Sequence, residues 1–237
     1  MGLLTLDHFA RTIKESYDAT GLPIIADADT GFGEAEMVRR TVLEYVKSGA
    51  AGLHLEDQKF PKRCGHLDGK ELVPADHMIE KVQWAAKAAK ETKTGFIICA
   101  RTDARGVEGF DAAVKRAAAY VEAGADMIFP EAMGSLDDYR RFKAAVQVPI
   151  LANLTEFGST PFYTTDELRD AGVDIALYCC GAYRAMNKAA LHFYETVRRE
   201  GTQKNIIDTL QTRNELYDFL GYHAYEDKLD MLFAQNK

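Results

Sequence analysis

The chain has 237 residues, of which 47% are hydrophobic and 27% charged, and this composition excludes a disordered chain and a membrane-embedded one. Its formal net charge of −7 argues against a nucleic-acid partner, because phosphate binding requires clustered lysine and arginine. Residues 1–20 mix charged and apolar side chains without a continuous apolar segment, so we expect no secretory signal, no membrane partner and a cytosolic protein.

The predicted elements alternate between helices and short apolar runs. In chain order they are a helix at 6–19, an apolar run at 23–26, a helix end with glycine and apolar run at 47–56, a run at 95–100, a helix at 111–123, a second helix-glycine-run segment at 122–131, a helix at 136–146, a run at 148–152 and a third such segment at 170–178. Glycine after a helix accepts the left-handed conformation that ends it, and the short run that follows suits a strand buried on both faces. The pattern predicts six strands.

Strict alternation of strands and helices predicts a parallel sheet in a single α/β domain. Polar residues directly follow the apolar part of the strands: Asp27, Asp29, Glu56, Asp57, Arg101, Asp103, Glu131, Asn153 and Thr155. In a (β/α) barrel this edge is the catalytic face. A doubly wound open sheet also binds ligands at this edge, but the chain has no glycine-rich phosphate-binding motif that opens a helix. We therefore predict a barrel.

Beyond residue 180 the pattern is helical, with helices predicted at 182–200, 202–220 and 225–235. We predict a barrel at 1–180, incomplete at its N-terminus, and a C-terminal helical extension of the same domain at 181–237. Apolar rows in these helices, such as Ile206 with Leu210, need a surface to cover them. We expect this surface to be the barrel wall or a second subunit.

The four cysteines are too few for a disulfide scaffold and lack metal-finger spacing, so we expect free thiols at Cys64, Cys99, Cys179 and Cys180. Cys99 lies in an apolar run and is predicted to be a buried hydrophobic residue. Cys64 differs, because it lies in a basic segment of a loop of about 18 residues, and loops that long are often lids.

The basic neighbours of Cys64 are Lys62, Arg63 and His66, and positive charge favours a thiolate. Cys64 is therefore a candidate acid or base. The alternative is an exposed basic loop with an incidental cysteine.

Asp27 and Asp29 are separated by one residue at a predicted strand end, so we expect their carboxylates to share a face. Carboxylate oxygens suit Mg²⁺, although a turn or helix cap is an equally frequent reason for such a pair. Three arginines are candidate carboxylate clamps, with a surface position as the alternative for each: Arg101, Arg184 and Arg213. Glu131, Asn153, Thr155 and Glu156 are placed to contact a substrate, and we expect His54 to be a hydrogen-bonded core residue.

These motifs resemble a known family. Segment 62–66, Lys-Arg-Cys-Gly-His, resembles the signature of isocitrate and methylisocitrate lyases, and 27–33 resembles the metal-binding strand end of that superfamily. Further matching segments are 53–58, 100–104, 129–132, 148–158 and 211–217. The resemblance covers essentially the whole chain, and the compact layout is most similar to the 2-methylisocitrate lyase family.

The resemblance implies a (β/α)8 TIM barrel of the isocitrate lyase superfamily, of which this chain would contain about six of the eight strands. In the family, two strands precede the helix at 6–19, and the second ends in a Ser-Gly-Gly segment that helps to hold substrate. We therefore expect an upstream segment to be needed for a complete barrel. The resemblance also implies a homo-oligomer, either a dimer or a tetramer built from dimers.

The implied activity is retro-aldol cleavage of 2-methylisocitrate, a small tricarboxylate, to pyruvate and succinate, with Mg²⁺ as cofactor and Mn²⁺ as an alternative. The implied metal ligands are Asp27, Asp29 and Glu56. The implied catalytic residues are Cys64 as general acid, with Lys62, Arg63 and His66 stabilising the departing fragment. The implied substrate contacts are Gly65, Arg101, Glu131, Asn153, Thr155, Arg184 and Arg213.

Other readings stay open at this point. Isocitrate lyase, oxaloacetate decarboxylase and phosphoenolpyruvate mutase are activities of the same superfamily, and the loop cysteine argues against the last two. A chain without the upstream strands could instead be an inactive binding or structural subunit.

Overall fold

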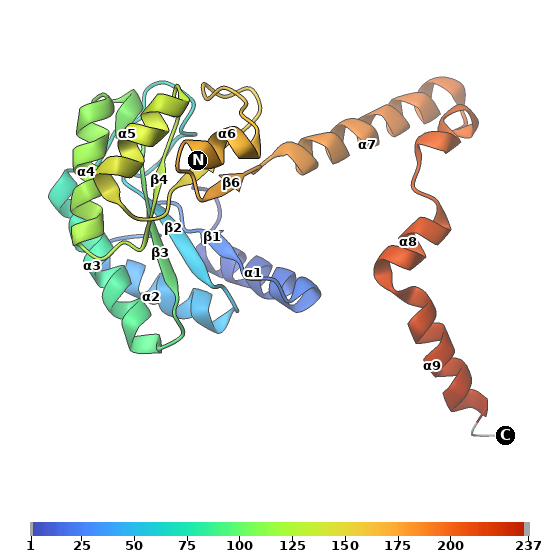
Figure 1. Cartoon of the computed structure of the whole chain (residues 1–237). Helices are drawn as coiled ribbons and strands as arrows, with labels where there is room; N and C mark the ends of the chain where they lie inside the picture. The colour runs from blue at the N-terminus through green and yellow to red at the C-terminus, as the bar shows by residue number, and fades with distance from the viewer. Residues whose placement is uncertain (1, 235–237) are drawn as a thin grey trace. The chain divides into compact units, whose positions relative to one another are not determined.

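The computed structural model describes residues 2–234, of which residues 2–180 form one compact unit and residues 181–234 a second. The first unit contains six short strands in an α/β arrangement (Figure 1). They are β1 (Ile25–Asp27), β2 (Gly52–Glu56), β3 (Ile97–Thr102), β4 (Met127–Pro130), β5 (Leu151–Asn153) and β6 (Ile175–Leu177). The six predicted strands are thus confirmed, with ends shifted by up to three residues.

The strands are parallel and lie in chain order. β1, β2, β3 and β4 form one sheet, β5 pairs with β6, and a parallel bridge between Ile128 and Ile150 links β4 to the β5 segment. Each strand therefore neighbours the next one in the sequence, with a helix in each connection. This is the order of a TIM-barrel-type fold, as predicted.

Six helices accompany these strands: α1 (Leu6–Thr20), α2 (Ala35–Lys47), α3 (Ala75–Thr92), α4 (Phe110–Glu122), α5 (Leu136–Val146) and α6 (Thr165–Asp170). Three of the connections contain the predicted glycine after the helix, and Gly49, Gly124 and Gly172 all have positive φ. The left-handed backbone ends each helix and turns the chain into the following strand.

Two apolar clusters lie on opposite faces of the sheet, because neighbouring residues of a strand point to opposite faces. One cluster joins Leu53, Ile98 and Ile128 to the helices, which pack side by side along that face (Figure 1). The other cluster contains Cys99 and Phe129 on the inner face. Cys99 is fully buried, as predicted. Both faces are covered, so the polar groups gather at the strand ends.

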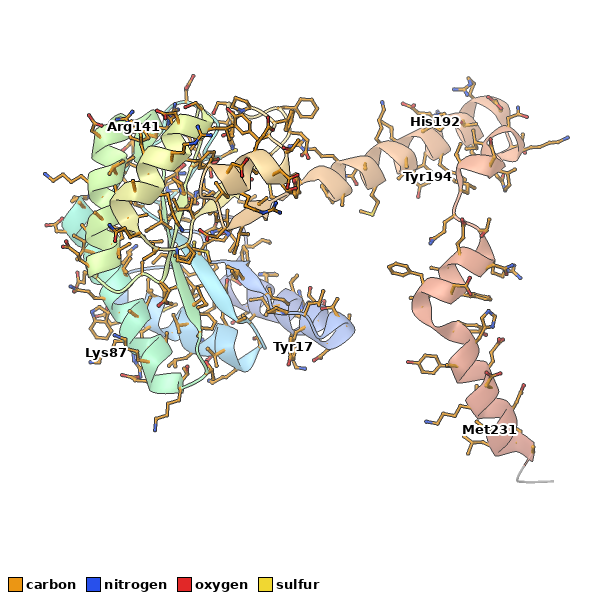
Figure 2. The ribbon with its side chains drawn as sticks, viewed as in Figure 1. Tyr17, Lys87, Arg141, His192, Tyr194 and Met231 are labelled. Atoms are coloured by element: carbon orange, nitrogen blue, oxygen red, sulfur yellow. The ribbon has the colours of Figure 1, made fainter. Side chains whose placement is uncertain are left out.

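The second unit contains α7 (Gly181–Glu200), a 3-10 helix at Lys204–Thr209, α8 (Arg213–Leu220) and α9 (Tyr222–Ala234). The single helix predicted at 202–220 is wrong, because Thr212 caps a new helix by accepting a hydrogen bond from the Glu215 N–H. Many large apolar side chains of this unit are exposed, including Tyr194 on α7 and Met231 on α9 (Figure 2). No helix in the described part of the chain has the length and apolar content to cross a bilayer.

Candidate active site

Strand β1 ends at Asp27, and the chain turns at once. Asp29 has a φ of 46°, and the Gly31 N–H donates to the Ala28 carbonyl oxygen at 2.7 Å. The two aspartates are therefore not related by the pleat of one strand, and that part of the prediction is wrong. Instead, the Asp27 carboxylate accepts from the Asp29 backbone N–H at 2.8 Å. The turn keeps both carboxylates at the strand end.

The Asp27 carboxylate faces His54, whose Nδ1 lies 3.6 Å from Asp27 Oδ1. Burial opposes ionisation of Asp27, but His54, Lys62 and the Asp29 N–H outweigh it and lower its pKa. His54 is buried in β2, as predicted, with its ring edge toward Phe129. Its Nδ1 has no hydrogen-bond partner among the described residues, so a hydrogen bond at that atom is not found.

Lys62 connects the long loop to the strand ends. Its Nζ lies 2.7 Å from Asp29 Oδ1 and 3.6 Å from Glu56 Oε2. Burial works against this ammonium, yet Glu56, Asp27 and Asp29 raise its pKa, so it stays charged. The loop therefore inserts a cation among the predicted metal ligands.

Glu56 is a buried carboxylate at the end of β2, with only 1% of its surface exposed. Burial is the main reason that its pKa is raised to about 7, against the opposing influence of Arg101 and Lys62. Neither of its side-chain oxygens has a hydrogen-bond donor in the described part of the protein. Burial of such a carboxylate costs free energy unless a ligand supplies the missing partner of its oxygens.

Arg101, on β3, lies between three carboxylates. Its guanidinium donates to both Asp103 oxygens, at 3.0 and 3.2 Å, and lies 3.4 Å from both Glu56 and Glu131. The guanidinium also packs over the Phe129 ring, 4.9 Å from its centroid. Burial opposes its charge, but the three carboxylates raise its pKa well above the usual range. Arg101 is a fixed positive centre.

Glu131 is held from two sides. His66 Nε2 lies 2.6 Å from Glu131 Oε1, and the Asn153 amide donates to the same oxygen at 3.4 Å. Burial disfavours its charge, but Arg101 and His66 outweigh burial and lower its pKa. The Ser159 backbone N–H donates to His66 Nδ1 at 3.1 Å, which fixes the imidazole.

Gly65 lies directly on this group. A Cβ atom at this position would lie 2.3 Å from Glu131 Cγ, 2.5 Å from Arg101 Nη2 and 2.7 Å from Asp103 Oδ1. Side chains do not approach so closely, so only glycine fits with the loop in this position. Lys70 holds the segment in place by donating to the Gly65 carbonyl oxygen at 2.6 Å.

Cys64 and Arg63 face outward, although the loop contributes Lys62, Gly65 and His66 to the site. Both outward side chains are exposed. The Gln58 side chain anchors Arg63 through two hydrogen bonds to its backbone, each 2.9 Å long. In this loop conformation the structure does not bring the Cys64 thiol into the cluster.

The remaining predicted contacts divide between the two units. Thr155 is buried just beyond β5, near Asn153. Arg184 lies on α7 and Arg213 begins α8, both with exposed side chains in the second unit. Both arginines belong to the second unit, and their contact with substrate stays a prediction.

Sequence reasoning noted Asp57 and Asp103 at strand ends but gave neither a role. The Asp57 carboxylate accepts from Thr102 Oγ1 at 2.7 Å, from the Tyr120 hydroxyl at 2.9 Å and from the Asp103 N–H at 3.0 Å. Asp103 orients Arg101. The spacing of Arg101 and Asp103 could have indicated this contact, since residues i and i+2 lie on one side of a strand. No local signal identified Lys70 or Ser159.

A divalent cation fits the oxygen donors at this edge. Asp29 and Glu56 already hold the Lys62 ammonium as a cation, and both Glu56 oxygens lack a hydrogen-bond donor among the described residues. Carboxylate oxygens are the ligands that Mg²⁺ and Mn²⁺ prefer. The distances do not form a ready metal cage in the described part of the chain, because Lys62 lies between the carboxylates.

The chain is similar to known proteins along its full length. A family model described as phosphoenolpyruvate phosphomutase matches residues 1–198. The chain is 55% identical to a 2-methylisocitrate lyase of Escherichia coli strain K12 over 238 aligned residues, which cover 100% of this chain and 80% of the relative. A crystal structure of 2,3-dimethylmalate lyase has a TM-score of 0.88 with 32% identity and covers 100% of this chain and 77% of that one.

A structure of phosphonopyruvate hydrolase in complex with oxalate and Mg²⁺ has a TM-score of 0.81 with 27% identity and covers 95% of this chain and 78% of that one.

Proposed function

Because the chain belongs to the phosphoenolpyruvate phosphomutase family, we propose that it is a carbon–carbon lyase that cleaves 2-methylisocitrate to pyruvate and succinate. The observation that carries this proposal is the 55% identity with a 2-methylisocitrate lyase along the whole chain. The side chains that gather at the strand ends, Asp29, Glu56, Lys62, Arg101 and Glu131, support it. Buried cations and carboxylates at the carboxyl ends of parallel strands suit a small polyanionic substrate.

The metal ligands would be Asp27, Asp29 and Glu56. Mg²⁺, with Mn²⁺ as the alternative, would act there as a Lewis acid that favours the alkoxide form of the substrate hydroxyl. Support comes from the Glu56 oxygens without donors and from the Mg²⁺ in the similar phosphonopyruvate hydrolase structure.

The protein's own cations bind and orient the substrate carboxylates. Arg101 is held rigidly by Asp103 and remains charged, so it stabilises the negative charge that develops on the departing succinate fragment. Lys62 adds positive charge from the loop, His66 offers its Nε2 at Glu131, and Asn153 offers an amide beside Glu131. Thr155, Arg184, Arg213 and the Gly65 backbone are further proposed contacts.

Cys64 is the proposed general acid, which donates the thiol proton to the carbon of the succinate fragment. The thiol is exposed in this loop conformation. On either side of it, Lys62 pairs with Asp29 and Gly65 lies against Glu131 and Arg101. A rearrangement of the loop must therefore turn the thiol inward once substrate is bound, and the same movement excludes water.

We also propose that the protein is cytosolic and works as a homo-oligomer, a dimer or a tetramer. The exposed apolar side chains of the second unit support the oligomer, because apolar surfaces of that kind commonly mark contacts between subunits.

A lyase assay tests the function. Release of the oxo-acid product would be measured with and without Mg²⁺: pyruvate from 2-methylisocitrate, glyoxylate from isocitrate and pyruvate from oxaloacetate. We expect cleavage of 2-methylisocitrate with the highest kcat/KM and none after chelation. A preference for isocitrate or oxaloacetate would assign another activity of the family, and binding without turnover would assign a binding subunit.

A further inference from the structure

Two thiols lie side by side after β6. Cys179 and Cys180 follow Tyr178, and their Sγ atoms are 3.6 Å apart. Neighbouring side chains of an extended strand point to opposite faces, so the two sulfur atoms approach only because the backbone has left the strand conformation. Cys179 is exposed and Cys180 is partly exposed. Reagents in solution therefore reach both sulfur atoms.

The pair belongs to the same edge of the sheet as the candidate active site. The Leu154 N–H donates to the Leu177 carbonyl oxygen at 2.9 Å, which holds the end of β5 against the end of β6. Cys179 is within hydrogen-bonding reach of the Thr155 side chain and feels the charge of Glu131. A molecule bound to the two sulfur atoms therefore lies beside a proposed substrate contact.

The separation of the sulfur atoms fits a shared ligand better than a disulfide. A disulfide requires about 2.05 Å between its sulfur atoms. Two sulfur ligands of one tetrahedral centre, each with a bond of about 2.3 Å as for Zn²⁺, lie about 3.8 Å apart. The two thiols, which are joined here by a hydrogen bond from Cys179 to Cys180, are 3.6 Å apart, close to that value. Sulfur ligands favour soft acceptors.

We propose that Cys179 and Cys180 form a dithiol site that captures a soft, thiophilic acceptor with two open positions, of the class of the organic trivalent arsenicals. With phenylarsine oxide, two S–H bonds and the As–O bond break, two As–S bonds form, and one water molecule leaves. Arsenic stays trivalent, so no oxidant is needed. The bound arsenical covers Thr155 and so excludes the substrate. The exclusion of substrate rests on the proposed function.

The protonation state of Cys179 agrees with this choice of ligand. Burial raises the pKa of the Cys179 thiol, and Cys180 and Glu131 raise it further against the Thr155 hydroxyl. Alkylating reagents need the thiolate, so they react slowly with such a thiol. An acceptor that binds two neighbouring thiols at once gains from their proximity.

The test is a titration of the full chain with phenylarsine oxide, followed by intact mass spectrometry. We expect one adduct per chain in the wild type and in Cys64→Ser, the control for the other exposed cysteine. Cys179→Ser and Cys180→Ser should each bind at least roughly 100-fold more weakly, because the second As–S bond is intramolecular and its loss removes the chelate. Cys99 is fully buried and serves as an internal negative.

An adduct that persists in either serine variant, or that requires Cys64, would overturn the proposal. If a serine variant fails to fold, peptide mapping of the wild type decides: the adduct must protect both Cys179 and Cys180 under a prolonged iodoacetamide treatment that labels both in the arsenical-free protein. In the activity arm, we expect inhibition that substrate prevents and that 2,3-dimercaptopropanol reverses. A complete adduct with unchanged lyase activity would refute the exclusion of substrate, whereas an untreated protein without lyase activity would contradict only the proposed function.

Discussion

Two neighbouring carboxylates at the end of β2 lie in opposite environments. Asp57 accepts three hydrogen bonds, from Thr102, Tyr120 and the Asp103 backbone. We call these four residues the Asp57 network. Glu56 lacks any hydrogen-bond donor among the described residues, and the Lys62 and Arg101 cations lie 3.6 and 3.4 Å from its Oε2. The residues around it form the Glu56 cluster: Asp29, Glu56, Lys62, Arg101 and Glu131.

The contrast separates a carboxylate that holds the structure from one that is kept for a ligand. Both are almost completely buried, and burial raises the pKa of both. In the Asp57 network, hydrogen bonds offset the cost of burial inside the fold. In the Glu56 cluster, Arg101 and Lys62 offset the cost only in part, and the pKa stays raised to about 7, which is a pattern typical of functional sites. Four predictions test this division.

The largest effect is expected for Asp29→Ala. Loss of this oxygen donor should lower kcat by on the order of 10³-fold or more and abolish stabilisation of the fold by Mg²⁺. Without Mg²⁺, the urea midpoint should barely change, because Asp29 belongs to the Glu56 cluster. Asp18→Ala, at an exposed carboxylate of α1, is the control. Activity that survives chelation would refute the metal site.

The next effect is on stability, in a paired comparison. Asp57→Asn places an amide donor against the donors of Thr102 and Tyr120 and should lower the free energy of unfolding by about 3 kcal/mol. Glu56→Gln removes a buried charge without a hydrogen-bond donor and should be neutral or slightly stabilising. Urea denaturation of both variants decides, and equal losses would erase the distinction between the two carboxylates.

A smaller effect is expected for Gly65→Ala, which tests how the loop meets the Glu56 cluster. The added methyl group collides with Glu131 and Arg101, so the loop cannot seat. We expect kcat/KM to fall by roughly 10- to 100-fold, since a displacement of about 1 Å at a site has that consequence. Thermal unfolding should be nearly unchanged. A normal kcat/KM would mean that catalysis does not need the seated loop.

The smallest effect is expected for Asp174→Asn, at a satisfied carboxylate that is 43% exposed. Asp174 accepts from the Ile150 N–H at 2.8 Å and from Lys143 at 2.7 Å. Burial opposes ionisation, but these donors lower its pKa below the ordinary value of 3.8. Its contribution to stability is therefore present above pH 3.8 and is lost as the pH falls through the lower folded value.

At neutral pH the Asp174→Asn variant should lose less than about 1 kcal/mol, because solvent screens an exposed pair. The difference from the wild type should be constant between about pH 8 and pH 5 and shrink only in stronger acid. Urea titrations across this range measure it. A loss as large as that of Asp57→Asn would show that exposure does not matter here.

The alternation of the strands and the polar residues at their ends were predictable, because both follow from local patterns of two to four residues. The partners that each carboxylate contacts were not predictable. Glu56 and Asp57 look alike in the sequence, and only the long-range partners Thr102 and Tyr120 distinguish them. The path of the loop was not predictable either, because it is set by Gln58 and Lys70, each five residues from its partner, and these contacts leave Cys64 outside.

The approach of Cys179 to Cys180 also depended on a backbone change that no local pattern indicated. The break between the 3-10 helix and α8 was in principle visible, since Thr212 and Glu215 have the spacing of a capping box.

Lys62 makes the protein carry its own competitor for cations. The ammonium is tethered to the loop and contacts Asp29 and Glu56, so it occupies them at a high effective concentration. Any divalent cation that binds there must displace it, and the loop loses one of its attachments in the exchange. Thermodynamic linkage makes this reciprocal, so that whatever holds the loop away from the strand ends tightens cation binding by the same factor.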